Sequence, residues 1–171
     1  MSPRSPHRTD PVRHGPAPRA GNRHATALAV LDATHAVLER GWLQQAERVV
    51  RDESGHLVVD GHGEVVRACL VGAVAEGARR HGGAVTSAVG PALDALWSAY
   101  ASASRPTDGA LGPVPSPVVR ASRARELAAW NDAPARTRDQ VLALVVLASR
   151  RVRCELDVLA GTPAADVPAL A

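Results

Sequence analysis

The sequence predicts a mainly α-helical fold, a compact bundle of about five helices with one short β-hairpin packed on it. About one residue in five is alanine, and the 171 residues include neither phenylalanine nor isoleucine. Alanine is small and is the strongest helix former, so this composition favours closely packed helices over a sheet. Apolar residues recur with a helical period in several segments, and the period changes only near residues 43–63. The length suits a single domain with a real core.

Residues 1–24 are predicted to be a disordered basic tail and residues 161–171 a flexible C-terminal tail, on either side of a helical domain at 25–160. The first tail holds five of the 13 prolines, and five arginines against one acidic residue. It has too few apolar side chains to offset the entropy of ordering. The rest of the chain is nearly neutral, with 15 arginines and 16 acidic residues. Nucleic-acid binding is therefore expected to be weak at most and confined to the tail.

The first predicted helix covers residues 25–40 and ends at Gly41, a residue type that suits a helix terminus. One face of this helix carries a stripe at helical spacing, formed by Leu28, Leu31, His35, Leu38 and Trp42. Because His35 lies on this apolar stripe, it is predicted to be a buried, hydrogen-bonded histidine rather than a catalytic one.

Residues 43–63 are predicted to form the short β-hairpin, with Gly55 in the turn. His56, Asp60 and His62 would share one face if the second strand continued that far, and such side chains can begin a metal site. The sequence offers no fourth ligand, so neither a metal nor another cofactor is predicted.

The second predicted helix covers residues 64–80. Its small residues form a surface that a neighbouring helix can approach closely, at Gly72, Ala73 and Gly77. Cys69 is placed well inside this helix. A nucleophilic thiol prefers an electropositive and partly exposed position, so Cys69 is interpreted as a packing residue. Together with Cys154 it does not make a disulfide framework.

Residues 90–103 predict a third helix with Pro91 at its first position. The Pro- and Gly-rich loop at 102–117 is long for a compact domain, which indicates either mobility or a binding element. A fourth helix is expected from Pro117, with Ser116 as its N-cap. Its arginines are interpreted as a solvated face, with phosphate pairing as the alternative, at Arg120, Arg123 and Arg125.

The segment WNDAPARTRDQV, residues 130–141, separates the fourth helix from the last one. Trp130 is interpreted as an aromatic anchor at the end of the fourth helix. Asn131 tolerates the left-handed conformation just after a helix, and Asp132 can accept loop amides. This helix punctuation explains the segment without catalysis, although both polar side chains could instead project into a pocket beside Trp130.

The last helix is predicted over residues 138–156. Thr137 and Gln140 have the spacing of a capping box at its start. The helix opens with apolar residues on nearly every side, from Val141 to Leu147, so it is expected to be the central helix of the bundle.

Three segments also carry a resemblance: GW at 41–42, ACLVGA at 68–73 and WNDAPARTRDQV at 130–141. Over roughly residues 26–150 the chain resembles a family of small proteins of high-GC Gram-positive bacteria and their phages, which is described only as a domain of unknown function. The resemblance implies a shared architecture and no particular mechanism. Members often carry a cysteine directly after the Gly-Trp pair, where this chain has Leu43, so a mechanism that needs two cysteines there is not expected.

Two functional hypotheses follow. The first is a non-catalytic interaction or regulatory module that binds a protein partner, or itself, through the basic tail and the 102–117 loop. The second is a small enzyme or ligand-binding protein with a cleft lined by Cys69, Trp130, Asn131 and Asp132. The candidate ligand or structural site of the chain comprises these four residues and Trp42.

The first hypothesis is preferred, because the sequence has no Gly-rich phosphate loop, dinucleotide fingerprint or nucleophile elbow. The sequence also shows no secretory signal and no apolar run long enough to span a membrane, so a soluble, cytoplasmic protein is expected.

Overall fold

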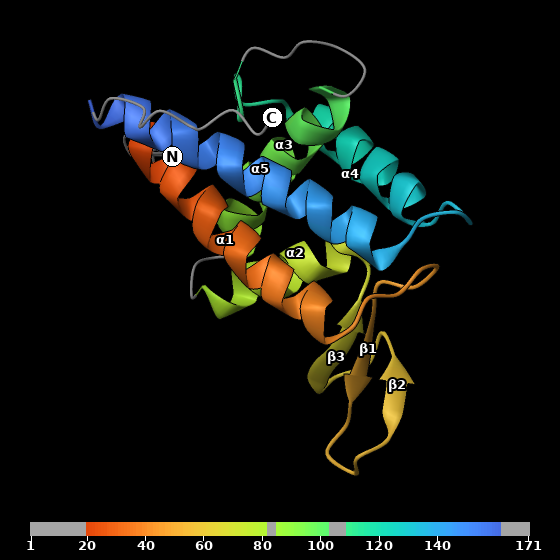
Figure 1. Cartoon of the computed structure of the whole chain (residues 1–171). Coiled ribbons are helices and arrows are strands. Elements are labelled where there is room, and N and C mark those ends of the chain that lie inside the picture. Colours follow the sequence, from red (N-terminus) through yellow and green to blue (C-terminus); the bar gives the residue numbers. More distant parts are fainter. Residues whose placement is uncertain (1–19, 82–84, 103–108, 162–171) are drawn as a thin grey trace, which may run out of the picture.

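The computed structural model describes residues 20–81, 85–102 and 109–161. As predicted, the fold is mainly α-helical, and a small antiparallel sheet accompanies the helices (Figure 1). The helices are α1 (Ala20–Arg40), α2 (Leu70–Arg80), α3 (Val85–Ser102), α4 (Pro117–Asn131) and α5 (Arg138–Leu159). The strands are β1 (Arg48–Arg51), β2 (Leu57–Val59) and β3 (Glu64–Ala68). Most of both predicted tails, residues 1–19 and 162–171, lies outside the described residues.

Helix α1 is the central element, because it packs against α2, α3 and α5 and also contacts β3. It begins at Ala20, so residues 20–24 are helical and do not belong to a tail. Its buried face is formed by Ala27, Val30, Leu31, Thr34, Val37 and Leu38. His35 lies beside this face rather than on it, and the prediction that it is buried is wrong. Its side chain is 32% exposed and pairs with Glu39 at 3.5 Å.

Helix α5 runs beside α1 but is not central (Figure 1). Only one stripe of it is buried, and its members are Val141, Leu144, Val145, Ala148 and Val152. Leu147 is 44% exposed. The prediction of a central last helix is therefore wrong. Its run of apolar residues exceeds what its contacts with α1 and α3 cover.

The sheet has the strand order β2-β1-β3 and projects from one end of the helical bundle (Figure 1). The predicted hairpin is present as β1 and β2, with Gly55 at a φ of 84° in its turn. The third strand, β3, replaces the first part of the helix predicted at 64–80. It pairs with β1 and buries Val65 and Ala68, an arrangement that β-branched residues favour.

Helix α3 begins at Val85, so Pro91 lies inside the helix and not at its first position. The following loop was predicted to be either mobile or a binding element. Residues 103–108 lie outside the described part of the chain, but in the part that follows, Ala110 and Leu111 are buried against the body. These two residues of the loop are therefore part of the core, whereas Gly112 to Val114 are exposed.

The small residues of α2 allow two close approaches. At Gly77 a β-carbon would lie 2.9 Å from the Val30 carbonyl oxygen of α1, so this glycine allows close helix packing as predicted. At Gly72 a β-carbon would lie 2.2 Å from the Glu47 carbonyl oxygen, so the neighbour there is the segment before β1 and not a helix. The start of α2 is thus fixed against the base of the sheet.

Candidate functional site

The Trp-Asn-Asp motif lies where α4 ends. Asn131 is the last residue of α4, and Asp132 is its C-cap with φ −87° and ψ 0°. Among the described residues other than glycine, only Gln45 and Asp60 have a positive φ. The prediction of a left-handed Asn131 after the helix is therefore wrong: this residue keeps a helical backbone and points its side chain into the protein.

The Asn131 side chain is fully buried and uses all of its hydrogen-bonding capacity. Its Oδ1 accepts from Trp42 Nε1 at 2.8 Å and from the Leu70 amide at 3.2 Å. Its Nδ2 donates to the Leu43 carbonyl at 3.2 Å and to Asp132 Oδ1 at 2.8 Å. One amide side chain therefore joins the end of α4 to the segment after α1 and to the first turn of α2.

Two glutamines that the sequence did not point to complete this junction. Gln44 Nε2 donates to the carbonyls of Asn131 and Ala133, at 2.8 Å each, and so satisfies acceptors at the end of α4. The Gln45 amide donates to Asp132 Oδ1 at 3.0 Å, and Gln45 holds a φ of 62°. A polar pair after Gly-Trp looks like an ordinary loop, so nothing in the sequence marks these residues.

Trp130 is the anchor that the sequence predicted. Its ring meets Tyr100 edge-on, with ring centroids 6.1 Å apart. The Arg136 guanidinium lies 3.9 Å from the Trp130 ring centroid, and Arg136 Nε donates to the Trp130 carbonyl at 3.1 Å. The predicted capping box of Thr137 and Gln140 is also confirmed.

Cys69 is the N-cap of α2. The prediction that it lies inside the helix is therefore wrong. Its Sγ accepts a hydrogen bond from the Gly72 amide at 3.3 Å. Burial raises the pKa of the Cys69 thiol, and the charges of Asp132 and Glu47 raise it further, against the lowering effect of the amides at the helix start. Burial outweighs those amides, so the thiol is held in its neutral and weakly nucleophilic form.

The structure therefore brings Trp42, Asn131 and Asp132 together by hydrogen bonds, and Cys69 is the chain neighbour of Leu70, which joins the same network. We use the name junction cluster for six residues: Trp42, Gln44, Gln45, Cys69, Asn131 and Asp132. Trp130 borders it by its backbone and directs its ring to Tyr100.

The candidate metal ligands are not gathered into a site. His56 has a side chain 79% exposed, and Asp60 accepts the Arg48 amide at 3.1 Å. Within the described ranges, no three histidine, cysteine or acidic side chains are grouped as metal ligands. Of the helices in those same ranges, none has the length and hydrophobicity needed to cross a membrane.

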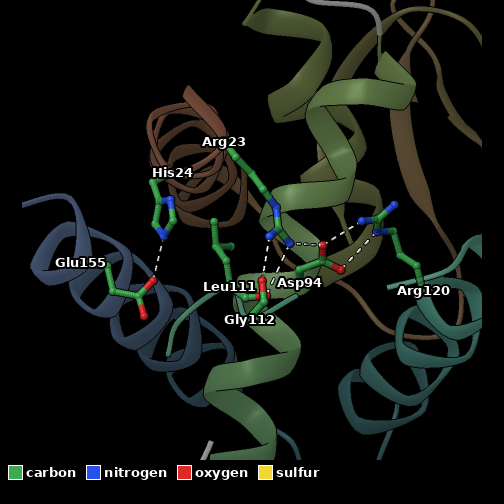
Figure 2. Close-up of polar contacts among 7 residues, drawn as sticks. All are labelled: Arg23, His24, Asp94, Leu111, Gly112, Arg120 and Glu155. Atoms are coloured by element: carbon green, nitrogen blue, oxygen red, sulfur yellow. Dashed lines mark hydrogen bonds and ion pairs between the residues drawn. The ribbon is translucent and has the colours of Figure 1, made fainter. Parts of the chain in front are cut away.

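A second polar cluster, not predicted from the sequence, surrounds Asp94 (Figure 2). The Asp94 carboxylate is completely buried and accepts from Arg23 Nη2 at 2.8 Å. Arg120 donates to it through Nε at 3.1 Å and Nη2 at 2.8 Å. Breaking such a buried pair generally costs about 3–5 kcal/mol. The available signal was that Asp94 is the single charged residue of the 18-residue helix α3.

The three arginines of α4 do not form one solvated face. Arg120 turns inward to Asp94, and this hydrogen bond raises the pKa of its guanidinium. Arg123 lies 4.0 Å from the ring centroid of Trp97. Arg125 alone is exposed as predicted. The prediction is therefore wrong for the first two, because α3 supplies a carboxylate and an indole directly opposite them.

Further contacts hold the loop before α4 (Figure 2). Arg23 Nη1 donates to the Gly112 carbonyl at 2.8 Å. Glu155 accepts from the Ala110 amide and pairs with His24, whose Nε2 lies 2.8 Å from Glu155 Oε2. The start of α1, the end of α5 and this loop are thus joined by charged side chains.

Helices packed around α1, a small sheet at one end and buried polar junctions between them define a small helical domain. Over residues 22–151 the chain matches the model of the Family of unknown function (DUF6197), and it belongs to that family. This range agrees with the 26–150 span of the resemblance found in the sequence. No curated protein matches the chain, and no solved structure does.

Proposed function

We propose that this chain is a non-catalytic interaction module that binds a protein partner. The observation that carries the proposal is the hydrogen bonding of the junction cluster. The side chains of Trp42, Gln44 and Asn131 and one oxygen of Asp132 are bonded within the cluster or to nearby backbone groups. Asn131 has no donor or acceptor left for a ligand, and Asp132 Oδ1 is already shared by two donors. These residues position α2 and α4 and leave little capacity for chemistry.

The enzyme alternative requires an activated thiol or an available acid or base in this cluster. Cys69 is 8% exposed and its pKa is raised, which opposes thiolate formation. Asn131 is fully buried. Both observations favour the interaction module over an enzyme that uses Cys69, Trp130, Asn131 and Asp132.

An apolar surface near the predicted binding loop supports the interaction itself. Three valines lie within six residues and are strongly exposed: Val114 at 68%, Val118 at 77% and Val119 at 43%. We call them the valine segment. It covers the end of the loop and the first turn of α4. Apolar side chains gathered in this way mark protein contact sites more often than isolated ones do.

The reactivity of the two cysteines tests the non-catalytic part of the proposal. At pH 8, iodoacetamide should alkylate Cys154, which is exposed, about 100-fold or more faster than Cys69, because Cys69 reacts only after local opening. Mass spectrometry of the intact protein and its peptides gives both rates. Cys154→Ser isolates the slow thiol, and urea should abolish its protection.

A fast reaction of Cys69 below pH 7 in the Cys154→Ser protein would overturn the non-catalytic assignment, since it requires a stabilised thiolate. If Asp132→Asn then changed that rate, the carboxylate would belong to a coupled catalytic pair.

The valine segment is tested by site-specific photocrosslinking in the native cell. A benzoylphenylalanine at position 118 should give a discrete adduct, because Val118 is the most exposed of the three valines. Ser54 is the control position, since it is exposed in the β1–β2 turn at the sheet end of the molecule (Figure 1). The adduct is identified by mass spectrometry, and a second copy of the chain counts as a partner.

Equal crosslinking at positions 118 and 54, or none at either, would refute the valine segment as the contact surface. Loss of the adduct when Val114 and Val119 are changed to serine would support it.

A further inference from the structure

A surface hollow lies between the first turns of α1, the first two turns of α3 and the start of α4. Its volume is about 370 Å³, at the small end of the range of ligand pockets. It is lined by Asn22, Arg23, Thr26, Ser87, Gly90, Pro91, Val114 and Arg120. None of the junction cluster contributes to it, so it is separate from the Trp-Asn-Asp motif.

The charge of this hollow is unbalanced. Two guanidinium groups line it, those of Arg23 and Arg120, and no acidic residue does. Their shared partner Asp94 lies between them, and its side chain has no exposed surface (Figure 2). One carboxylate against two guanidinium groups leaves a formal charge of +1 at the wall. A partly desolvated site of this kind favours an anion.

The guanidinium groups also keep donors for a ligand. Arg120 binds Asp94 through Nε and Nη2. Among the residues that the structure describes, no hydrogen bond is made by its Nη1. The bidentate contact with Asp94 fixes the plane of the group, so the cost of ordering a long side chain is already met before a ligand binds. Arg23 is held similarly, by Asp94 and the carbonyls of Leu111 and Gly112.

We infer that this hollow binds a small organic anion through a single oxyanion group, a carboxylate or a phosphate. The oxyanion contacts Arg120 and Arg23, while Pro91 and Val114 supply an apolar wall for the rest of the molecule. Asn22 and Thr26 add polar groups on the α1 side. The inference goes beyond the proposed interaction module and does not depend on it, since it uses neither the junction cluster nor a protein partner.

The test is a titration followed by NMR of the arginine Nε–Hε groups and backbone amides. Benzoate and phenyl phosphate are the probes, at constant ionic strength, and neutral benzamide is the control ligand. Saturable shifts at Arg120 and Gly90 with either anion, and none with benzamide, are the expected result. The anion that binds with the higher affinity shows whether the hollow prefers a carboxylate or a phosphate.

Two variants locate the site. Arg120→Gln should weaken anion binding at least about tenfold, because a charged hydrogen-bond donor is removed. Arg125→Gln removes the same charge from the exposed side of α4 and should change the affinity less than about twofold.

Gly90→Ala tests the binding site with a variant that is expected to remain folded. Its β-carbon would lie 3.0 Å from Arg120 Cζ and 3.2 Å from Nη1, so the guanidinium group has to shift by only a few tenths of an ångström while it keeps its contact with Asp94. Alanine is a better helix former than glycine, so the fold should be kept while the hollow is partly filled. We expect at least about a tenfold loss of affinity in a protein that still melts cooperatively.

Three results would overturn the inference: wild-type affinity in a folded Gly90→Ala protein, shifts that do not saturate, or equal shifts with benzamide. None of these results affects the cysteine or crosslinking tests of the proposed function, so the two proposals fail separately.

Discussion

Asn131→Ala should lower the free energy of unfolding by about 3–5 kcal/mol. The substitution removes four hydrogen bonds at once and leaves the Trp42 indole, the Leu70 amide and the Leu43 carbonyl without their partner. An unsatisfied buried polar group costs about 1–3 kcal/mol, and part of that is recovered if water enters. Urea unfolding followed by tryptophan fluorescence and by circular dichroism measures the change.

Asp132→Asn is the matched control. The amide oxygen of the new side chain can still accept from the Gln45 amide and from Asn131 Nδ2, so only the charge is lost. We expect a change within about 1 kcal/mol. Trp42→Phe removes a single one of the four bonds and should fall between the two. A loss below about 1 kcal/mol for Asn131→Ala would contradict the assignment of Asn131 as the residue that holds the junction.

The position of this junction can be predicted from the sequence, but the hydrogen-bond partners of Asn131 cannot. The motif at 130–132, the capping box and Trp130 as an anchor are all read from neighbouring residues, and local geometry decides them. The partners of Asn131 lie far away in the chain: Trp42 is 89 positions distant and Leu70 is 61. No periodicity or spacing in one sequence predicts such pairings, so Asn131 was interpreted as a turn residue and Gln44 was overlooked.

The error at residues 64–68 has a different physical origin. The run Glu-Val-Val-Arg-Ala is too short to distinguish a helical from a strand period. Because a helix follows directly, the predicted helix was extended back over this run. Pairing with β1 decides the matter, since β3 completes the sheet and buries Val65 against Val50. Because β3 occupies residues 64–68, Cys69 is the N-cap of α2 and does not lie within the helix. Its thiol therefore accepts a backbone amide at the helix start.

The sequence contains an indication that Asp94 is either paired or exposed to water. An acidic residue in an otherwise uncharged helix must either face water or be paired, and this one is buried with two partners. The composition alone could not name Arg23 and Arg120 as those partners, because both arginines lay in segments that were interpreted as solvated. A buried charge predicts that cations are near, and the fold decides which ones.

Gly72→Ala should lower the free energy of unfolding by about 3 kcal/mol or more. A β-carbon at position 72 would lie 2.2 Å from the Glu47 carbonyl oxygen and 3.0 Å from its carbon. Both are backbone atoms, so no side-chain rotation relieves the contact. The helix start or the segment before β1 has to move, and thermal unfolding followed by circular dichroism reports the loss.

Gly90→Ala is the matched control for stability, because there the new methyl group meets only the end of the Arg120 side chain and no backbone atom. Its stability should stay within about 1 kcal/mol of wild type, since helix propensity favours alanine. Equal melting temperatures for the two variants would contradict the role of Gly72.

The Glu47 carbonyl cannot simply retreat from an alanine at position 72, because it also accepts the Cys69 amide at 3.0 Å. Moving it breaks the contact that fixes the first turn of α2, and that turn carries both the Cys69 thiol and the Leu70 amide bound by Asn131. Gly72→Ala is therefore expected to speed the alkylation of Cys69 as well as to lower stability, whereas Gly90→Ala should leave Cys69 protected. A destabilised Gly72→Ala protein with an unchanged alkylation rate, measured well below its unfolding transition, would show that the strain is absorbed away from the junction cluster.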